Sequence, residues 1–168
     1  MNAMDVLDIA PLDWWAILSC FLSALVIGLE RQLQGKPIGI RTSALICMGT
    51  YVFVAMTREV SNNATDPSRI VGQVITGIGF LGAGVMMNRN GSVVGVTSAA
   101  SIWILAAVGV IIGMGYNRLG VKIAILTVGI LVGVNWLEHS FGFMQRGVHV
   151  KLEQRKKRHK KAPSEGQQ

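Results

Sequence analysis

Residues 66–87 read DPSRIVGQVITGIGFLGAGVMM, and this stretch predicts a membrane-spanning helix. Asp66 followed by Pro67 is a helix-start signal, because an aspartate caps free backbone N–H groups and proline suits the first helical position. No charged side chain occurs from Ile70 to Met87. A helix of about 20 residues spans the hydrocarbon core of a bilayer, which is roughly 30 Å thick.

The same stretch is rich in glycine, with Gly72, Gly77, Gly79, Gly82 and Gly84. Glycine weakens helices in water, but in lipid the backbone must satisfy its own hydrogen bonds and the helix persists. Because small residues let neighbouring helices approach closely, we expect these glycines to be packing positions. They fall on two faces, so this helix is expected at the centre of a bundle, where a bulky residue at Gly79 would prevent folding.

Four further apolar runs cover residues 14–29, 42–57, 94–116 and 119–137. With 51% hydrophobic residues and a mean hydropathy of +0.46, the chain is predicted to be an all-α, polytopic membrane protein with a five-helix transmembrane bundle. The later runs add five expected packing glycines: Gly95, Gly109, Gly113, Gly129 and Gly133. We expect a periplasmic N-terminus (1–12), a membrane domain (13–138) and a basic cytoplasmic tail (139–168). Residues 1–12 lack the basic start of a signal peptide, so the first run should be retained.

Charge predicts the orientation. Residues 144–168 hold eight of the sixteen Lys and Arg. With the N-terminus outside and the C-terminus inside, twelve of the sixteen face the cytoplasm, which agrees with the positive-inside rule. The tail is expected to touch anionic lipid headgroups of the bilayer. No aromatic interleaving or fold supports nucleic-acid binding.

Four blocks carry a resemblance to a known family: GLERQ (28–32), GIRTSALICMG (39–49), the DPxR…Q…GIGFLGAGVMM stretch (66–87), and GVTSAASIWILAAVGVIIGMG (95–115). In their order and spacing, over roughly residues 15 to 137, they resemble the MgtC/SapB family of bacterial inner-membrane proteins. The resemblance implies a five-span domain in the inner (plasma) membrane with a cytoplasmic C-terminus.

The resemblance also implies a role. Family members are associated with magnesium limitation, stress response and survival inside macrophages. The best-known member is thought to regulate other membrane proteins, notably the F-type ATP synthase. That member carries a soluble domain after its fifth span, whereas this sequence continues only into a short basic tail, so functions of that domain are not carried over.

Charged and polar residues near the span ends are the functional candidates. Glu30, Arg31 and Arg41 are expected at the cytoplasmic mouth, either as headgroup anchors or as a functional cluster. Asp66 and Arg69 are expected at the opposite face, as a cap and surface pair or as a binding site. Gln73 lies about one turn inside the apolar zone, where a buried amide needs partners. We favour an interhelical hydrogen bond for it over a ligand contact.

A weak internal echo suggests that the first two spans and the next two are parallel repeats, although chance could also produce it. Gly28 and Gly84 are 56 residues apart, as are Gly39 and Gly95. Thr42-Ser43-Ala44 follows Gly39, and Thr97-Ser98-Ala99 follows Gly95. If the repeat is real, two hydroxyl-bearing helix N-termini, at Thr42-Ser43 and at Thr97-Ser98, share the cytoplasmic mouth with Arg41, and this arrangement would favour an anionic group. The alternative is that the threonines only cap their helices.

No catalytic constellation, metal-ligand set or cofactor motif is recognisable, so we expect no enzyme and no cofactor. The leading hypothesis is a non-enzymatic regulator that acts through helix contacts with other membrane proteins, and a homo-oligomer is left open. The alternative is a small transporter or channel for an ion or solute. Ion pathways usually need charged groups at depth, and every charge here is expected near a membrane face.

Overall fold

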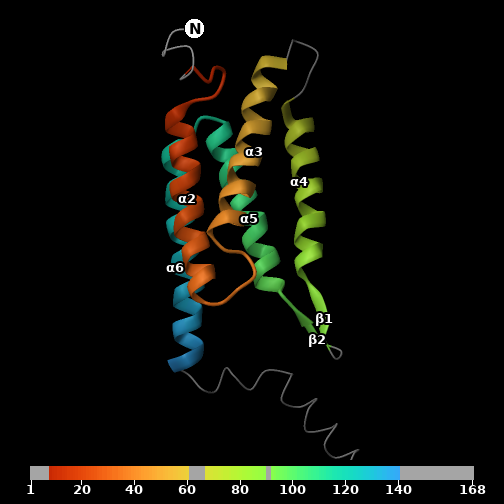
Figure 1. The fold of residues 1–168 in the computed structure, drawn as a ribbon, viewed down its shortest axis with the longest axis vertical. Coiled ribbons are helices and arrows are strands. Elements are labelled where there is room, and N and C mark those ends of the chain that lie inside the picture. Colours follow the sequence, from red (N-terminus) through yellow and green to blue (C-terminus); the bar gives the residue numbers. More distant parts are fainter. Residues whose placement is uncertain (1–7, 61–66, 90–91, 141–168) are drawn as a thin grey trace, which may run out of the picture. The chain divides into compact units, whose positions relative to one another are not determined.

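The computed structural model describes residues 8–60, 67–89 and 92–140, and within them the chain is almost entirely helical (Figure 1). Its helices are α2 (Trp14–Leu33), α3 (Ile40–Val60), α4 (Pro67–Val85), α5 (Val96–Gly113) and α6 (Asn117–Ser140). All five are long and apolar enough to cross a membrane, which confirms the predicted all-α membrane fold. A short antiparallel hairpin of β1 (Met87–Arg89) and β2 (Ser92–Val94) joins α4 to α5.

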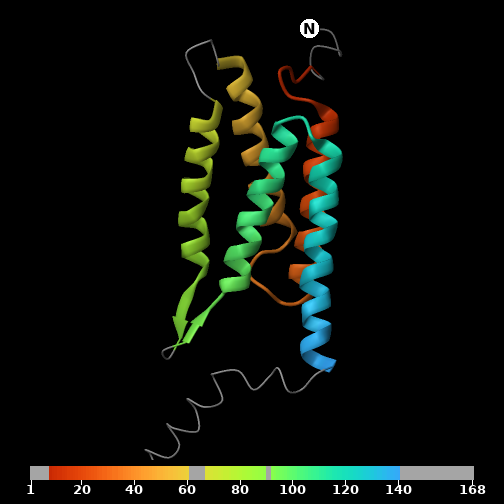
Figure 2. The same cartoon turned by 180° about the vertical axis from the view of Figure 1, so that it is seen from behind.

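The most deeply buried helix is α5, not α4. In the part of the chain that is described, α5 packs against α2, α3 and α4, and 56% of its spanning window is buried. Only 11% of the window of α4 is buried, and α4 lies at one edge beside α3 and α5 (Figures 1 and 2). The prediction that residues 67–87 form the central helix is therefore wrong for the single chain. The reason is that α5 contains no charged or amide side chain and can be enclosed, whereas α4 carries Arg69 and Gln73.

The start of α2 is tied to α3. The carboxylate of Asp13 accepts hydrogen bonds from the backbone N–H groups of Trp15 (3.2 Å) and Ala16 (3.3 Å), so it caps the helix. The backbone N–H of Asp13 in turn donates to the hydroxyl oxygen of Tyr51 on α3 at 2.9 Å. The first turn of α2 is thus held both by its own cap and by a neighbouring helix.

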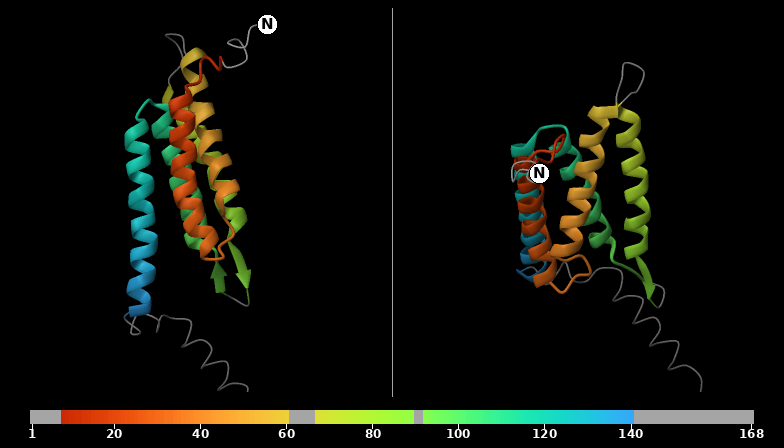
Figure 3. Two further views of the ribbon diagram at one scale, coloured as in Figure 1. Left: turned by 60° about the vertical axis from the view of Figure 1, so that its left-hand side comes forward. Right: turned by 45° about the horizontal axis from the view of Figure 1, so that its top comes forward.

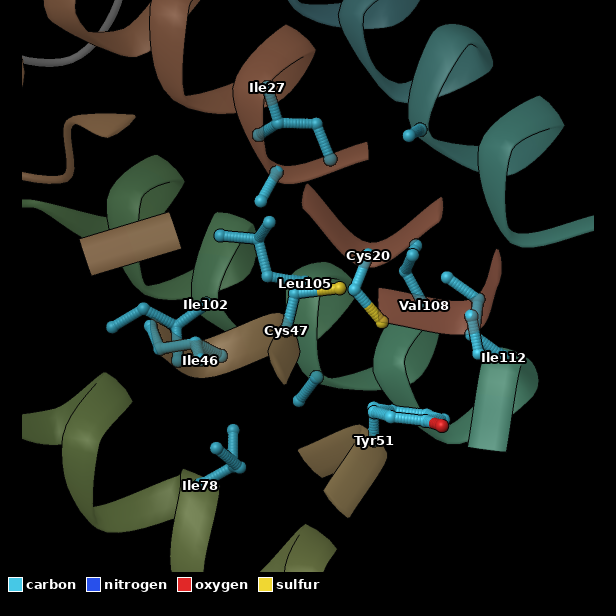
Figure 4. Packing of buried hydrophobic residues seen from close by; sticks show 14 of the residues in the cluster. Cys20, Ile27, Ile46, Cys47, Tyr51, Ile78, Ile102, Leu105, Val108 and Ile112 are labelled. Atoms are coloured by element: carbon cyan, nitrogen blue, oxygen red, sulfur yellow. The ribbon is translucent and has the colours of Figure 1, made fainter. Parts of the chain in front are cut away.

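The apolar core lies where α2, α3 and α5 meet. Cys20, Cys47 and Leu105 are fully buried at its middle (Figure 4). Both cysteines are free thiols, and their sulfur atoms lie side by side. At the edge of this core, α4 contributes Ile78, and Val74 and Val85 of the same helix pack against the core.

Residues 8–130 of the described chain belong to one compact unit, and the residues from Leu131 onward belong to a second. Within the first unit α6 meets α5 at Gly120, where an added Cβ would lie 2.6 Å from the side chain of Ile112. Ala124, one turn further along α6, is fully buried. The second unit is described only as the continuation of α6 to Ser140. The basic tail beyond Ser140 and the expected cap Asp66 lie outside the described residues.

Candidate functional site

Three helix termini meet at one end of the bundle: α2 ends there, and α3 and α5 begin there (Figures 1 and 3). We call it the Arg31 end and define it by Glu30, Arg31, Ser43 and Ser98. The N-termini of α3 and α5 contribute positive electrostatic potential at this end, and the C-terminus of α2 contributes negative potential. It is the end predicted to face the cytoplasm.

The last turn of α2 is fixed by its C-terminal motif. Gly35 adopts a φ of +64°, a left-handed conformation that favours glycine. The backbone N–H of Lys36 donates to the carbonyl of Arg31 at 3.0 Å, and that of Gly35 donates to the carbonyl of Gln32 at 3.1 Å. These bonds form a Schellman motif, which holds the turn that carries Glu30 and Arg31.

Arg31 points into the bundle. Its side chain is only 3% exposed, and its Nη2 donates to the hydroxyl oxygen of Ser98 on α5 at 2.7 Å. Glu30 is 9% exposed. The interpretation of these two residues as headgroup anchors is therefore wrong, because an anchor must reach the membrane surface. Arg31 and Ser98, which are 67 residues apart in the sequence, are brought together.

Ser43 lies at the same end of the bundle, where α2 and α3 approach each other closely. An added Cβ on Gly28 would lie 2.7 Å from the Cα atom of Ile40 and 2.9 Å from the Oγ of Ser43. Only glycine permits this approach. Ser43 is fully buried. Sequence reasoning did not select it as a site residue, although its place in the Thr-Ser-Ala echo, matching Ser98, was a usable signal.

Several polar atoms at the Arg31 end have no hydrogen-bond partner among the described residues. They are Arg31 Nε, Glu30 Oε2 and Ser43 Oγ, and Ser23 Oγ further along α2 shares the property. All four are buried within the protein, where an unpaired polar group costs roughly 1–3 kcal/mol. Such a cluster is the arrangement expected of a site that holds a bound molecule or water.

The other predicted members of this cluster face outward. Arg41 and Thr97 are exposed. The N-cap of α5 is Gly95, and no side chain caps this helix, so Thr97 is not its cap. The structure therefore bonds Arg31 to Ser98, buries Glu30 and Ser43 at the same end of the bundle, and leaves Arg41 and Thr97 exposed.

At the opposite end the candidates lie on α4. Arg69 and Gln73 are both exposed, and no hydrogen bond joins Gln73 to another described residue. Asp66 lies outside the described residues, so its pairing with Arg69 stays a prediction.

The expected packing glycines divide into two groups. Gly109 and Gly113 of α5 lie directly against α3, where added Cβ atoms would overlap Thr50 and Val54, and Gly82 lies in ordinary contact with Ala99 and Trp103 of α5. Gly95 adopts a φ of +92° beneath Val85. The others have no atom within 4 Å of the Cβ position: Gly72, Gly77, Gly79, Gly84, Gly129 and Gly133.

The model of the MgtC family matches residues 17–140, a range that contains α3 to α6 and all but the first three residues of α2. The chain belongs to the MgtC family. This MgtC-family chain is 40% identical over 133 residues to a protein of Escherichia coli K12 named "putative magnesium transporter YhiD", which covers 75% of this chain and 61% of the relative. It is also 40% identical over 118 residues to the protein MgtC of Salmonella typhimurium LT2, which covers 69% of this chain and 50% of the relative.

The MgtC-family chain thus spans half to three-fifths of the length of these two curated relatives. No solved structure matches it. Family membership and five apolar helices together make it a multi-pass membrane protein.

Proposed function

We propose that this protein is a non-enzymatic regulator of other membrane proteins in the bacterial inner membrane, and that it contacts them through one face of α4. The open face of α4 consists of Gly72, Gln73, Thr76, Gly79 and Phe80. In line with the family resemblance, the proposed role is adaptation to magnesium limitation, to stress or to life inside a host cell.

The proposal rests on one observation, the exposed side-chain amide of Gln73, which has no hydrogen-bond partner among the described residues. It is exposed and lies six residues into α4, about 9 Å from the helix start. In lipid, an amide without a partner is costly, and glutamine side chains at such depths form hydrogen bonds across helices. Since no described residue of this chain bonds to it, we assign that bond to a helix of another protein.

The glycines beside Gln73 support the same assignment. Helix α4 packs on α5 through the opposite stripe, which contains Ile78 and Gly82. On the open face, Gly72 and Gly79 have no neighbour within 4 Å. Lipid chains gain nothing from a glycine surface, whereas a partner helix can approach it closely and gain dispersion contacts.

A photo-reactive residue at position 73 tests the contact. The matched control is the same residue at Ile125 of α6, whose side chain is 58% exposed. We expect position 73, and not position 125, to form an adduct with one defined membrane protein, and the F-type ATP synthase is the first candidate to probe. An adduct of two copies of this chain would show that the open face of α4 mediates self-association and not contact with a regulated protein. Adducts with lipid alone would contradict the proposal.

The phenotype provides a second measurement. Gln73→Leu removes the amide, so we expect normal protein levels and loss of complementation in a null strain grown in low magnesium. The control is Thr127→Val on α6, outside the open face of α4, because the Thr127 hydroxyl is already satisfied by the carbonyl of Ile123 at 2.8 Å. Full complementation by Gln73→Leu would show that the function does not need the Gln73 amide.

Transport is a second candidate, and the buried serines favour it. Ser23 lies near the middle of α2, is fully buried and has no described partner, as expected of a group that lines a solute path. The name of the Escherichia coli relative supports magnesium as the species to test first. Flux into liposomes that contain the purified protein separates the two candidates: a regulator gives none above empty liposomes, whereas a transporter loses its flux in Ser23→Val.

A further inference from the structure

Hydrogen-bond donors predominate at the Arg31 end. The guanidinium of Arg31 uses Nη2 on Ser98 and leaves Nε–H without a described partner. The hydroxyl of Ser98 accepts that bond, so its own proton remains free to donate. The hydroxyl of Ser43 adds another unpaired donor.

Ser43 differs from five other hydroxyl residues on these helices. Ser19, Thr50, Thr76, Ser101 and Thr127 each donate to the backbone carbonyl four residues earlier, at 2.8–2.9 Å. This bond is the ordinary way in which a serine or threonine in a helix is satisfied. Ser43 is as buried as any of them and does not make it. Its hydroxyl is therefore available to something outside the backbone.

The surroundings favour a negative charge. Arg31 carries a permanent positive charge, and the N-termini of α3 and α5 present further positive potential. Helix α5 has no side-chain cap on its first N–H groups. An oxyanion can accept two parallel hydrogen bonds from one guanidinium, which makes arginine well suited to this ligand class.

Glu30 restricts the ligand further. Its Oε2 is buried and unpaired, and an ionised carboxylate can only accept hydrogen bonds. An anion without a proton would be repelled, whereas an anion with a hydroxyl group can donate to this oxygen. We propose that the Arg31 end binds a small oxyanion that carries a hydroxyl group, of which hydrogen phosphate is the simplest example.

The proposal predicts discrimination between two anions of similar size. Phosphate near neutral pH keeps at least one O–H and can satisfy Arg31, Ser43 and Glu30 together. Sulfate offers the same oxygens but has no proton for Glu30. The phosphodiester of an ordinary phospholipid likewise lacks a hydroxyl, whereas the phosphomonoester of phosphatidic acid has one.

The test uses the full-length protein in phosphatidylcholine nanodiscs, with thermal melting and calorimetric titration of phosphate and of sulfate. A ligand that binds only the folded state raises the melting temperature. We expect phosphate, and not sulfate, to raise it. Ser43→Ala should weaken phosphate binding about tenfold, because it removes one hydrogen bond to a charged ligand. Ser101→Ala, which removes a buried hydroxyl already bonded to its own helix, is the matched control and should bind as the unaltered chain does.

Glu30→Gln gives the sharper result, because the amide donates where the carboxylate accepts. We expect this variant to lose phosphate affinity about tenfold and to gain sulfate binding. Because the basic tail attracts any anion, an equal response to phosphate and sulfate that Ser43→Ala and Glu30→Gln leave unchanged would overturn the proposal. So would a folded protein that responds to neither phosphate nor phosphatidic acid.

The source of the ligand is settled in the same assay. A melting temperature raised by soluble phosphate assigns the site to a free ion. If phosphatidic acid in the nanodisc raises it and soluble phosphate does not, the ligand is a lipid headgroup, and the same dependence on Ser43 and Glu30 is expected.

Discussion

Arg31 shows what a single buried charge requires. Its side chain is buried within the protein, and Ser98 supplies its one described side-chain partner. A buried charge that loses a partner costs more than a neutral group in the same position. The stability of the Arg31 end should therefore depend on a serine that contributes almost nothing to the apolar core.

We accordingly expect Ser98→Ala to lower the free energy of unfolding by about 2 kcal/mol, because Nη2 of Arg31 is left without an acceptor. Ser101→Ala should cost below about 1 kcal/mol, since the donor that it removes bonded only to its own helix. Denaturant unfolding in mixed micelles measures both. Equal losses in the two variants would show that Arg31 finds another acceptor.

The helices differ in how they use glycine. On α5, Gly109 sits against Thr50 and the backbone of Cys47, so the glycine is what allows α3 and α5 to touch. On α4, Gly79 faces open space within this chain. The same residue type therefore serves packing inside the chain on one helix and leaves a bare surface on the other.

Gly109→Ala should destabilise the bundle by about 2–3 kcal/mol, because the added methyl group overlaps backbone that cannot rotate away. Gly79→Ala should change the unfolding free energy by less than about 0.5 kcal/mol, as is usual for surface substitutions. This replaces the expectation from the sequence that a bulkier residue at Gly79 prevents folding. A large loss of stability at Gly79 in the isolated protein would show that α4 packs within the chain after all.

The position and length of the apolar runs predicted the existence of all five helices, with ends within a few residues, since a span must be long enough to cross the bilayer. The order of burial could not be predicted in the same way. Glycine spacing shows that a neighbour can come close to Gly79, but it does not show whether that neighbour belongs to the same chain.

The candidate site was also predictable only in part: some of its residues followed from the sequence, but the orientation of the others did not. The motif GLERQ pointed to Glu30 and Arg31, and the echo pointed to Ser98. The inward rotation of Ser43 and the outward rotation of Arg41 depend on how α3 turns about its own axis. The close contact of Gly28 with Ile40 sets that rotation, and one sequence does not reveal it.

At the scale of the whole molecule, the two halves have matching neighbours. Helix α2 packs on α3 as α4 packs on α5, and α3 and α5 pack on each other. This is the arrangement that parallel repeats would give, and the bond from Arg31 to Ser98 crosses between the halves. The repeat and the orientation both stay predictions.

The orientation can be measured directly. We expect reporter fusions placed after Gln168 and within residues 88–92 to report the cytoplasm, because these segments belong to the Lys- and Arg-rich side. A periplasmic signal from either fusion would reverse or break the predicted topology.

The two free thiols of Cys20 and Cys47 allow the opening of the helix bundle to be measured by chemical labelling. Neither side chain has any exposed surface, so a membrane-permeant alkylating reagent can reach them only while α2 and α3 are apart. The labelling rate should therefore follow the population of the opened state. Gly109→Ala should accelerate the labelling and Gly79→Ala should not, as read by mass spectrometry on intact membranes. Rapid labelling of the unaltered protein would mean that the bundle opens far more often than its buried core suggests.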